Sequence, residues 1–275
     1  MNKKVNNGED RNLSQVLPFV TKEQSMSRNS GKVKKLNVVG DDAAAHKAFS
    51  SKKFSVHDLI SLQAKTSPQE QFIKSFYNQI PVILQIGSAG TGKTMVAMYC
   101  ALSEIFDNQT PYERLIIIRS AVQTRDIGFL KGSEEEKNES YEEPYENICD
   151  DIMNFKTNNY ENLKSKNLIH FRNSSFLRGL TWDNAIIIAD ECQSMTYHEL
   201  STIMTRVGIN SKIIFCGDIK QNDLHKKGDV SGLLQFMDVV DKMPSDMVDL
   251  VRYFPCDIVR SGIAKEFLLA EENEN

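Results

Sequence analysis

The chain has 275 residues, 40% of them hydrophobic and 25% charged, which suits one large α/β domain with an appendage and is too short for two such domains. Its formal net charge of −4 argues against a broadly basic nucleic-acid-binding surface and leaves room only for a local basic channel. Because the polar start carries no secretory signal and no apolar run has membrane-spanning length, the sequence predicts a cytoplasmic protein with no membrane partner.

The first part of the chain has the composition of a flexible arm. Residues 1–55 are rich in Asn, Ser, Lys and Asp and show no sustained apolar period, so we predict an arm followed by one domain over residues 56–272. The domain opens with a predicted helix over Gln69–Tyr77, which Pro68 would start and Thr66 or Ser67 would cap. Five widely spaced cysteines fit neither a zinc site nor a disulfide framework and are expected to be reduced, mostly buried thiols.

Short apolar runs follow this helix and predict an α/β fold. Four are almost continuously apolar, as expected of strands that helices cover on both faces in a mostly parallel sheet, whereas the fifth alternates and suits an edge. An acidic stretch between Lys131 and Asn147, with Pro144 near its end, is predicted to lie on the surface as a helix or a long loop. The runs are Val82–Ile86, Leu115–Ile118, Ala185–Ala189, Ile213–Cys216 and Met247–Phe254.

The first of these strands leads into a phosphate-binding motif. The motif has the form G-x-x-x-x-G-K-S/T and precedes a helical stretch over Met95–Leu102, which is the strand, loop and helix order that a P-loop requires. Its glycines let backbone N–H groups face the phosphates, Lys93 would bridge the β- and γ-oxygens of ATP, and Thr94 would bind Mg²⁺. The predicted nucleotide loop consists of Gly87, Ser88, Ala89, Gly90, Thr91, Gly92, Lys93 and Thr94.

Two further strands end in polar side chains, where ligands of open α/β sheets bind. Asp190 and Glu191 end the run Ala185–Ala189: Asp190 would hold Mg²⁺ through water, and Glu191 would orient or deprotonate the attacking water. Alone, such an acidic pair is a common strand end. Asp218 and Gln221 follow the run Ile213–Cys216 and are placed to sense the γ-phosphate, although a Gly-Asp turn by itself is an ordinary feature.

These three strand ends resemble the PhoH family of ATPases, relatives of the superfamily 1 helicase core, and phage-encoded PhoH-like proteins are similar in length. The resemblance runs from about Thr66 to Leu268 and implies a RecA-like P-loop NTPase core with three α/β/α layers. It also implies that Gln69 reads adenine and that an arginine completes the site, with Arg260 as the first candidate and Arg206 as the second.

The resemblance implies an ATPase that uses ATP and Mg²⁺, and three questions stay open. Because one core is present, the arginine would come from a neighbouring subunit of a homo-oligomeric ring such as a hexamer.

ATP turnover could drive remodelling of RNA or single-stranded DNA, with Phe129 or Phe171 stacking on bases in a channel. The alternative is a nucleotide-dependent switch that binds ATP and a protein partner with little turnover. If the protein is phage-encoded, it would work in the host cytoplasm. The channel candidates are Arg119, Arg125, Arg172, Lys226 and Lys227.

Overall fold

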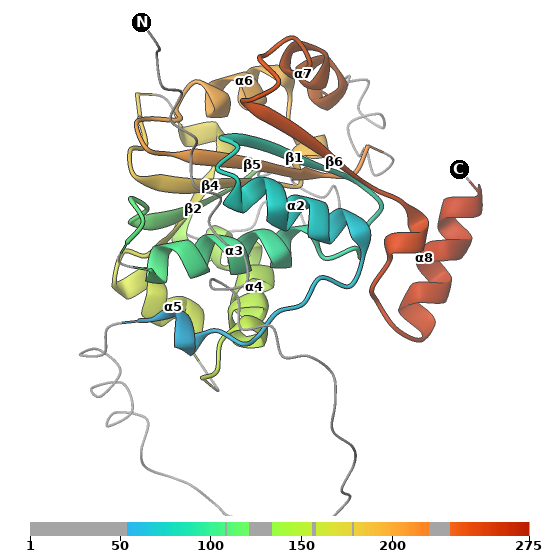
Figure 1. Cartoon of the computed structure of the whole chain (residues 1–275), viewed down its shortest axis with the longest axis horizontal. Coiled ribbons are helices and arrows are strands. Elements are labelled where there is room, and N and C mark those ends of the chain that lie inside the picture. Colours follow the sequence, from blue (N-terminus) through green and yellow to red (C-terminus); the bar gives the residue numbers. More distant parts are fainter. Residues whose placement is uncertain are drawn as a thin grey trace, which may run out of the picture. The chain divides into compact units, whose positions relative to one another are not determined.

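The computed structural model describes residues 54–107, 109–120, 134–155, 158–177, 179–219 and 232–274. Its centre is a six-stranded sheet in the order β3-β2-β4-β5-β1-β6, in which every pair of neighbours is parallel (Figure 1). All-parallel pairing agrees with the predicted α/β class. The strands are β1 Val82–Gly87, β2 Arg114–Arg119, β3 Ile169–Asn173, β4 Ala185–Asp190, β5 Lys212–Gly217 and β6 Val248–Tyr253.

The apolar content of each strand matches its place in the sheet. β4 and β5 are buried at every position, and β1 and β2 are buried except at their ends, because helices cover both faces. β6 is only partly buried and lies at an edge, so the five predicted strands and the edge position of the last are confirmed. The sequence analysis missed β3, since this other edge strand alternates Ile169 and Phe171 with His170 and Arg172 and has no apolar run.

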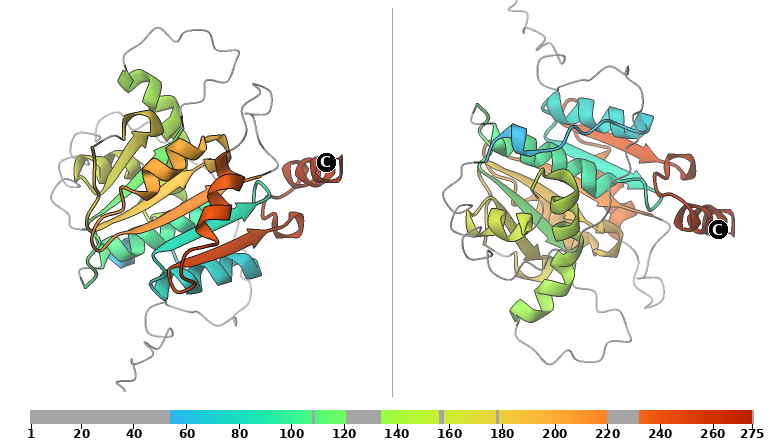
Figure 2. Two further views of the ribbon diagram at one scale, coloured as in Figure 1. Left: turned by 90° about the horizontal axis from the view of Figure 1, so that it is seen from above. Right: turned by 90° about the horizontal axis from the view of Figure 1, so that it is seen from below.

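Helices form a layer on each side of the sheet. α6 and α7 cover one face, and α2, α3, α4 and α5 cover the other, which gives the three α/β/α layers that were predicted (Figure 1). α8 lies beyond the carboxyl ends of β1 and β6 (Figure 2). The helices are α2 Ser67–Tyr77, α3 Lys93–Phe106, α4 Glu134–Ile152, α5 Asn159–Ser165, α6 Tyr197–Met204, α7 Gly232–Val240 and α8 Ile263–Glu274, with short 3₁₀ turns at Val56–Asp58, Ser174–Phe176, Cys192–Ser194 and Pro255–Asp257.

Local sequence explains where the helices near the P-loop begin. The Thr66 hydroxyl accepts a hydrogen bond from the backbone N–H of Gln69, and Pro68 lies in the first turn of α2, so Thr66 is the cap of the two that were predicted. α3 starts directly after Gly92, whose φ of 81° only glycine adopts without strain. From Glu134 onward the acidic stretch is the helix α4, with Pro144 inside it.

The chain just before residue 56 also packs on the domain. Phe54 is buried and stacks on Phe106 with ring centroids 5.2 Å apart, so this residue packs on the domain, whereas residues 1–53 lie outside the described part of the chain. All five cysteines are free thiols, and Cys256 is the exposed one. Over the described ranges, no helix is both long and apolar enough to cross a membrane.

Candidate nucleotide site

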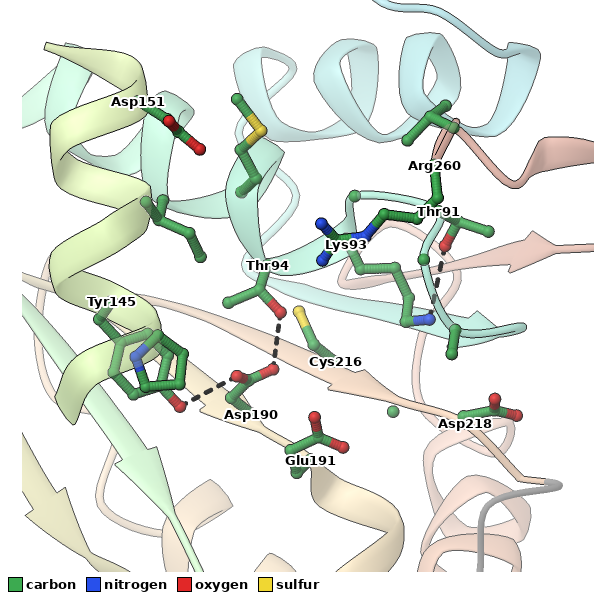
Figure 3. Close-up of a pocket in the computed structure, with 18 of the residues that line it drawn as sticks. Thr91, Lys93, Thr94, Tyr145, Asp151, Asp190, Glu191, Cys216, Asp218 and Arg260 are labelled. Atoms are coloured by element: carbon green, nitrogen blue, oxygen red, sulfur yellow. Dashed lines mark hydrogen bonds between the residues drawn. The ribbon is translucent and has the colours of Figure 1, made fainter. Parts of the chain in front are cut away.

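A cavity of about 550 Å³ opens at the carboxyl ends of β1, β4 and β5 (Figure 3). P-loop residues 89–94 form one side, and the ends of the two neighbouring strands supply Asp190, Glu191 and Asp218. α4 closes the far side with Tyr145 and its neighbours. The topology brings these groups together, because parallel strands all end at the same edge of the sheet and the polar residues at their carboxyl ends lie there.

The P-loop needs glycine because β6 and the chain after it press against it. Gly87 has φ 140°, and a Cβ there would lie 1.9 Å from the carbonyl oxygen of Tyr253 in β6. Ser88 donates its backbone N–H to that same oxygen, at 3.3 Å. Further along, the backbone N–H of Val259 donates to the carbonyl of Gly90 at 3.0 Å. The loop is therefore held on its outer side by the segment that follows β6.

Lys93 turns its ammonium group into the P-loop. Its Nζ donates to the carbonyl oxygens of Gly87 at 2.6 Å and Ser88 at 2.8 Å. Burial lowers the pKa of Lys93, while the nearby Asp218 carboxylate acts in the opposite direction. The cation thus lies among the loop backbone and the acidic strand ends, where charge on a triphosphate would be neutralised.

Thr94 and Asp190 meet at the start of α3. The Thr94 hydroxyl donates to Oδ1 of Asp190 at 2.8 Å, and the phenol of Tyr145, which is fully buried on α4, donates to Oδ2 at 2.9 Å. Burial raises the pKa of Asp190, and the adjacent Glu191 carboxylate raises it further, against the hydrogen bonds from Thr94 and Tyr145. A cation at this point would favour the ionised form of Asp190.

This donor set fits Mg²⁺. The described residues contain no cluster of three or more His, Cys, Asp or Glu side chains that could cage a metal. Mg²⁺ needs no such cage, because it keeps several waters and takes one or two protein oxygens together with substrate phosphates. The hydroxyl of Thr94 and the carboxylate of Asp190 are oxygen ligands of that kind.

Glu191 is fixed by its neighbour Gln193. Glu191 has a left-handed backbone with φ 51°, and its Oε2 accepts a hydrogen bond of 2.6 Å from the Gln193 amide. The carbonyl oxygen of that amide accepts the backbone N–H of Asp218 at 3.0 Å. Gln193, only 3% exposed, therefore joins the ends of β4 and β5 beside the cavity.

Sequence reasoning assigned no role to Gln193 or Tyr145. Gln193 was visible as the last residue of an Asp-Glu-Cys-Gln stretch, but its two contacts depend on the neighbouring strand. Tyr145 lies in the acidic segment, where nothing in the local sequence points to a strand end 45 positions away.

Some of the predicted site residues line the cavity and others do not. Besides the P-loop and the acidic residues, Arg260 lines the cavity of its own chain and points into it from beyond β6 (Figure 3). Gln69 is buried at 3% exposure, does not line the cavity and bonds to Thr91, so its contact with adenine stays a prediction. Gln221 lies outside the described residues.

Arg206, the second arginine candidate, lies away from this cavity. It follows α6, and its carbonyl accepts the backbone N–H of Trp182, which precedes the first residue of β4. Arg206 therefore lies at the amino edge of the sheet, whereas the P-loop lies at the carboxyl edge, a strand length of roughly 20 Å away. It cannot contact the nucleotide of its own chain.

Of the five cations predicted to line a nucleic-acid channel, two lie in the described part of the chain. Arg119 lines the cavity and lies 5.9 Å from the ring of Tyr141, and Arg172 is exposed on the edge strand β3. Phe171 packs its ring against Tyr145 with centroids 5.9 Å apart. The other candidates, Arg125, Phe129, Lys226 and Lys227, lie outside the described part of the chain.

Comparison with known proteins agrees with this geometry. The family described as "PhoH-like protein" matches residues 61–272. A PhoH-like protein of Bacillus subtilis (strain 168) is 29% identical over 216 residues, which are 78% of this chain and 65% of that protein. A PhoH-like protein of Mycobacterium leprae (strain TN) is 30% identical over 209 residues, covering 76% of this chain and 58% of that protein.

A third relative is the protein PhoH of Escherichia coli (strain K12), 29% identical over 215 residues, which cover 78% of this chain and 59% of that protein. In all three pairs the match spans less than two thirds of the relative's own length. The family match over residues 61–272 contains the P-loop and both acidic strand ends.

Proposed function

The chain belongs to the PhoH family of nucleotide-binding P-loop proteins, and from this premise we propose that it binds ATP and hydrolyses it with Mg²⁺. The observation that carries the proposal is the hydrogen bond of 2.8 Å between Thr94 and Asp190. The two side chains come from separate strand–loop units and converge beside Lys93, as the metal and phosphate chemistry of a P-loop NTPase requires.

Each cavity residue has a role in this proposal. The P-loop N–H groups and the Lys93 ammonium would bind the phosphates, while Thr94 and Asp190 would hold Mg²⁺, which neutralises phosphate charge when bound. Glu191 would orient the attacking water or accept its proton. Its carboxylate is directed by Gln193, which supports hydrolysis over binding alone. Arg260 would stabilise charge on the phosphates from within the same chain.

An ATP turnover assay with Glu191→Gln tests hydrolysis separately from binding. We expect wild type to release phosphate, and Glu191→Gln to bind ATP but turn it over at least about 100-fold more slowly, since the general base is lost. Lys93→Ala, which loses the phosphate-binding cation, is the control for binding. Equal and very slow turnover in wild type and Glu191→Gln would instead support the nucleotide-dependent switch.

Coupling to RNA or single-stranded DNA is a separate expectation of the family resemblance. Arg119 supports this coupling, because its side chain lines the cavity at the end of β2. A nucleic-acid strand bound there would lie next to the nucleotide. The same turnover assay with added single-stranded RNA or DNA tests the coupling: unchanged turnover counts against it. Native mass determination tests the predicted homo-oligomeric ring.

A further inference from the structure

Arg260 enters the cavity from a segment that lies along the P-loop (Figure 3). The backbone N–H of Val259 donates to the carbonyl of Gly90 at 3.0 Å, and the buried Ile258 side chain lies 3.7 Å from the position of a Cβ on Gly90. The backbone next to Arg260 is therefore fixed beside the loop. Among the described residues, none holds the guanidinium by a hydrogen bond or an ion pair, so its direction depends on how the aliphatic stem packs.

Leu268 of α8 packs at the same place. Its Cδ1 lies 2.9 Å, and the Cγ of Arg260 3.0 Å, from the position that a Cβ on Gly90 would take. Gly90 leaves this space open because it has no Cβ, and its φ of 71° is one that other residues rarely adopt. The stem of Arg260 and the tip of Leu268 therefore lie next to each other on one face of the P-loop.

α8 turns back toward the P-loop directly after the segment that carries Arg260. Gly262, with φ 60°, makes the turn, and its carbonyl accepts backbone N–H groups from the first turn of the helix. Leu268 is half-buried, whereas Ile263 and Phe267 of the same helix are 89% and 65% exposed. Of these three apolar side chains, Leu268 is the one that faces the rest of the protein.

A restrained arginine stabilises developing charge better than a free one. Fixing a free arginine costs rotamer entropy, and packing its stem in advance removes part of that cost. A misplacement of about 1 Å in a catalytic group can lower a rate by about 100-fold. Leu268 does not line the cavity, so any effect that it has on the reaction must pass through a neighbouring side chain.

We infer that Leu268 is a positioning residue that directs Arg260 into the nucleotide cavity. The inference rests on the proposed function, because Arg260 acts on phosphates only if a nucleotide binds there. If Leu268 acts through Arg260, its effect on turnover must vanish once the arginine side chain is removed. A side chain that merely stabilises α8 would lower turnover to the same degree with and without Arg260.

A double-mutant cycle on the full chain separates these two possibilities. Single-turnover hydrolysis of ATP, with protein in excess and Mg²⁺ present, should be about 10-fold slower in Leu268→Ala than in wild type. When Arg260→Ala is the starting protein, adding Leu268→Ala should slow it less than about twofold. Equal losses in the two backgrounds, or no loss in Leu268→Ala, overturns the inference.

Two further variants control for changes in the helix itself. Phe267→Ala, on the exposed side of α8, should keep the wild-type rate, and alanine favours helix at both positions. Leu268→Met fills a similar volume with a flexible side chain and should restore most of the rate. A loss in Phe267→Ala as large as that in Leu268→Ala would assign the effect to the helix and overturn the inference.

A second measurement needs no nucleotide. Hydrogen–deuterium exchange of a peptide covering residues 257–262 should be faster in Leu268→Ala than in wild type, because the segment loses a contact that holds it on the P-loop. Exchange in Phe267→Ala should match wild type. Equal exchange in all three proteins overturns the inference. If wild type does not hydrolyse ATP, the proposed function fails, and the exchange result still decides whether Leu268 holds the segment that carries Arg260.

Discussion

The side-chain amide of Gln193 donates a hydrogen bond of 2.6 Å to the carboxylate of Glu191, two residues before it. The other end of the amide accepts the backbone N–H of Asp218 from the next strand. An amide can do both at once, because its nitrogen donates to the carboxylate while its oxygen accepts from the N–H. The orientation of the Glu191 carboxylate, the proposed general base, therefore depends on contacts at the ends of both β4 and β5.

Replacing Gln193 by Met should lower the kcat of ATP hydrolysis by about 10- to 100-fold with little change in KM, because Glu191 loses its orienting partner while the phosphate-binding groups stay in place. Steady-state turnover measures both constants. Gln235→Met, at an exposed position of α7, is the control and should leave them unchanged. A normal kcat in Gln193→Met would contradict the assignment.

Tyr145 should control how tightly Mg²⁺ is held. Tyr145→Phe removes the hydroxyl that donates to Asp190, so we expect the Mg²⁺ concentration for half-maximal turnover to rise about 10-fold. A Mg²⁺ titration of turnover measures the effect. Tyr141→Phe is the matched control, since Tyr141 lies one helical turn away and contacts Arg119 through its ring, which Phe retains. Identical titrations for the two variants would exclude this role.

Arg260 should act on the nucleotide of its own chain. Its Cγ would lie 3.0 Å from a Cβ on Gly90, so the side chain packs directly on the P-loop that precedes Lys93. We expect Arg260→Ala to lower turnover, and a mixture of Arg260→Ala with Lys93→Ala chains to show at every ratio no more turnover than its Arg260→Ala chains show alone. Activity restored in the mixture would mean that the arginine is donated across subunits.

Gly87→Ala should destabilise the protein by about 2 to 4 kcal/mol, because a methyl group must share space with the Tyr253 carbonyl and a positive φ must be kept. Urea unfolding measures the loss. Gly179→Ala separates the two causes: Gly179 has φ 79° but nothing within 4 Å of its added Cβ, so it should cost only about 1 kcal/mol. Equal losses would show that contact with β6 does not matter.

Lys212 should make stability depend on alkaline pH. This side chain is 1% exposed and donates to the Phe76 carbonyl, and burial lowers its pKa from 10.5 to about 8. Between those two values the unfolded chain binds more protons than the folded one, so the free energy of unfolding should rise with pH across this window.

The gain should be at most about 3 kcal/mol, and it should be absent from Lys212→Met. Urea unfolding of wild type and Lys212→Met from pH 7 to pH 10.5 measures the gain. The difference in free energy of unfolding between the two proteins is compared across this range, because other groups also titrate. A difference that stays constant over this range would refute the prediction.

The sequence by itself determined the fold class and the chemical parts of the site. Short, almost continuously apolar runs separated by helical stretches are typical of the inner strands of a parallel sheet, and the polar residues that follow such strands lie at one edge of it. The P-loop motif, Asp190, Glu191 and Asp218 were therefore predictable from local patterns, and the structure places them around one cavity. β3 was missed because an edge strand needs no apolar run.

Only the tertiary structure decided how these parts are held and which candidates belong to them. Arg206 lies at the opposite edge of the sheet. Tyr145, on the acidic helix α4, donates a hydrogen bond to Asp190, and Gln69 donates one to the P-loop carbonyl of Thr91. None of these contacts joins near neighbours in the sequence. The physical reason is that a local pattern specifies which groups a segment carries, whereas the partner of each buried polar group is set by strand order and helix packing.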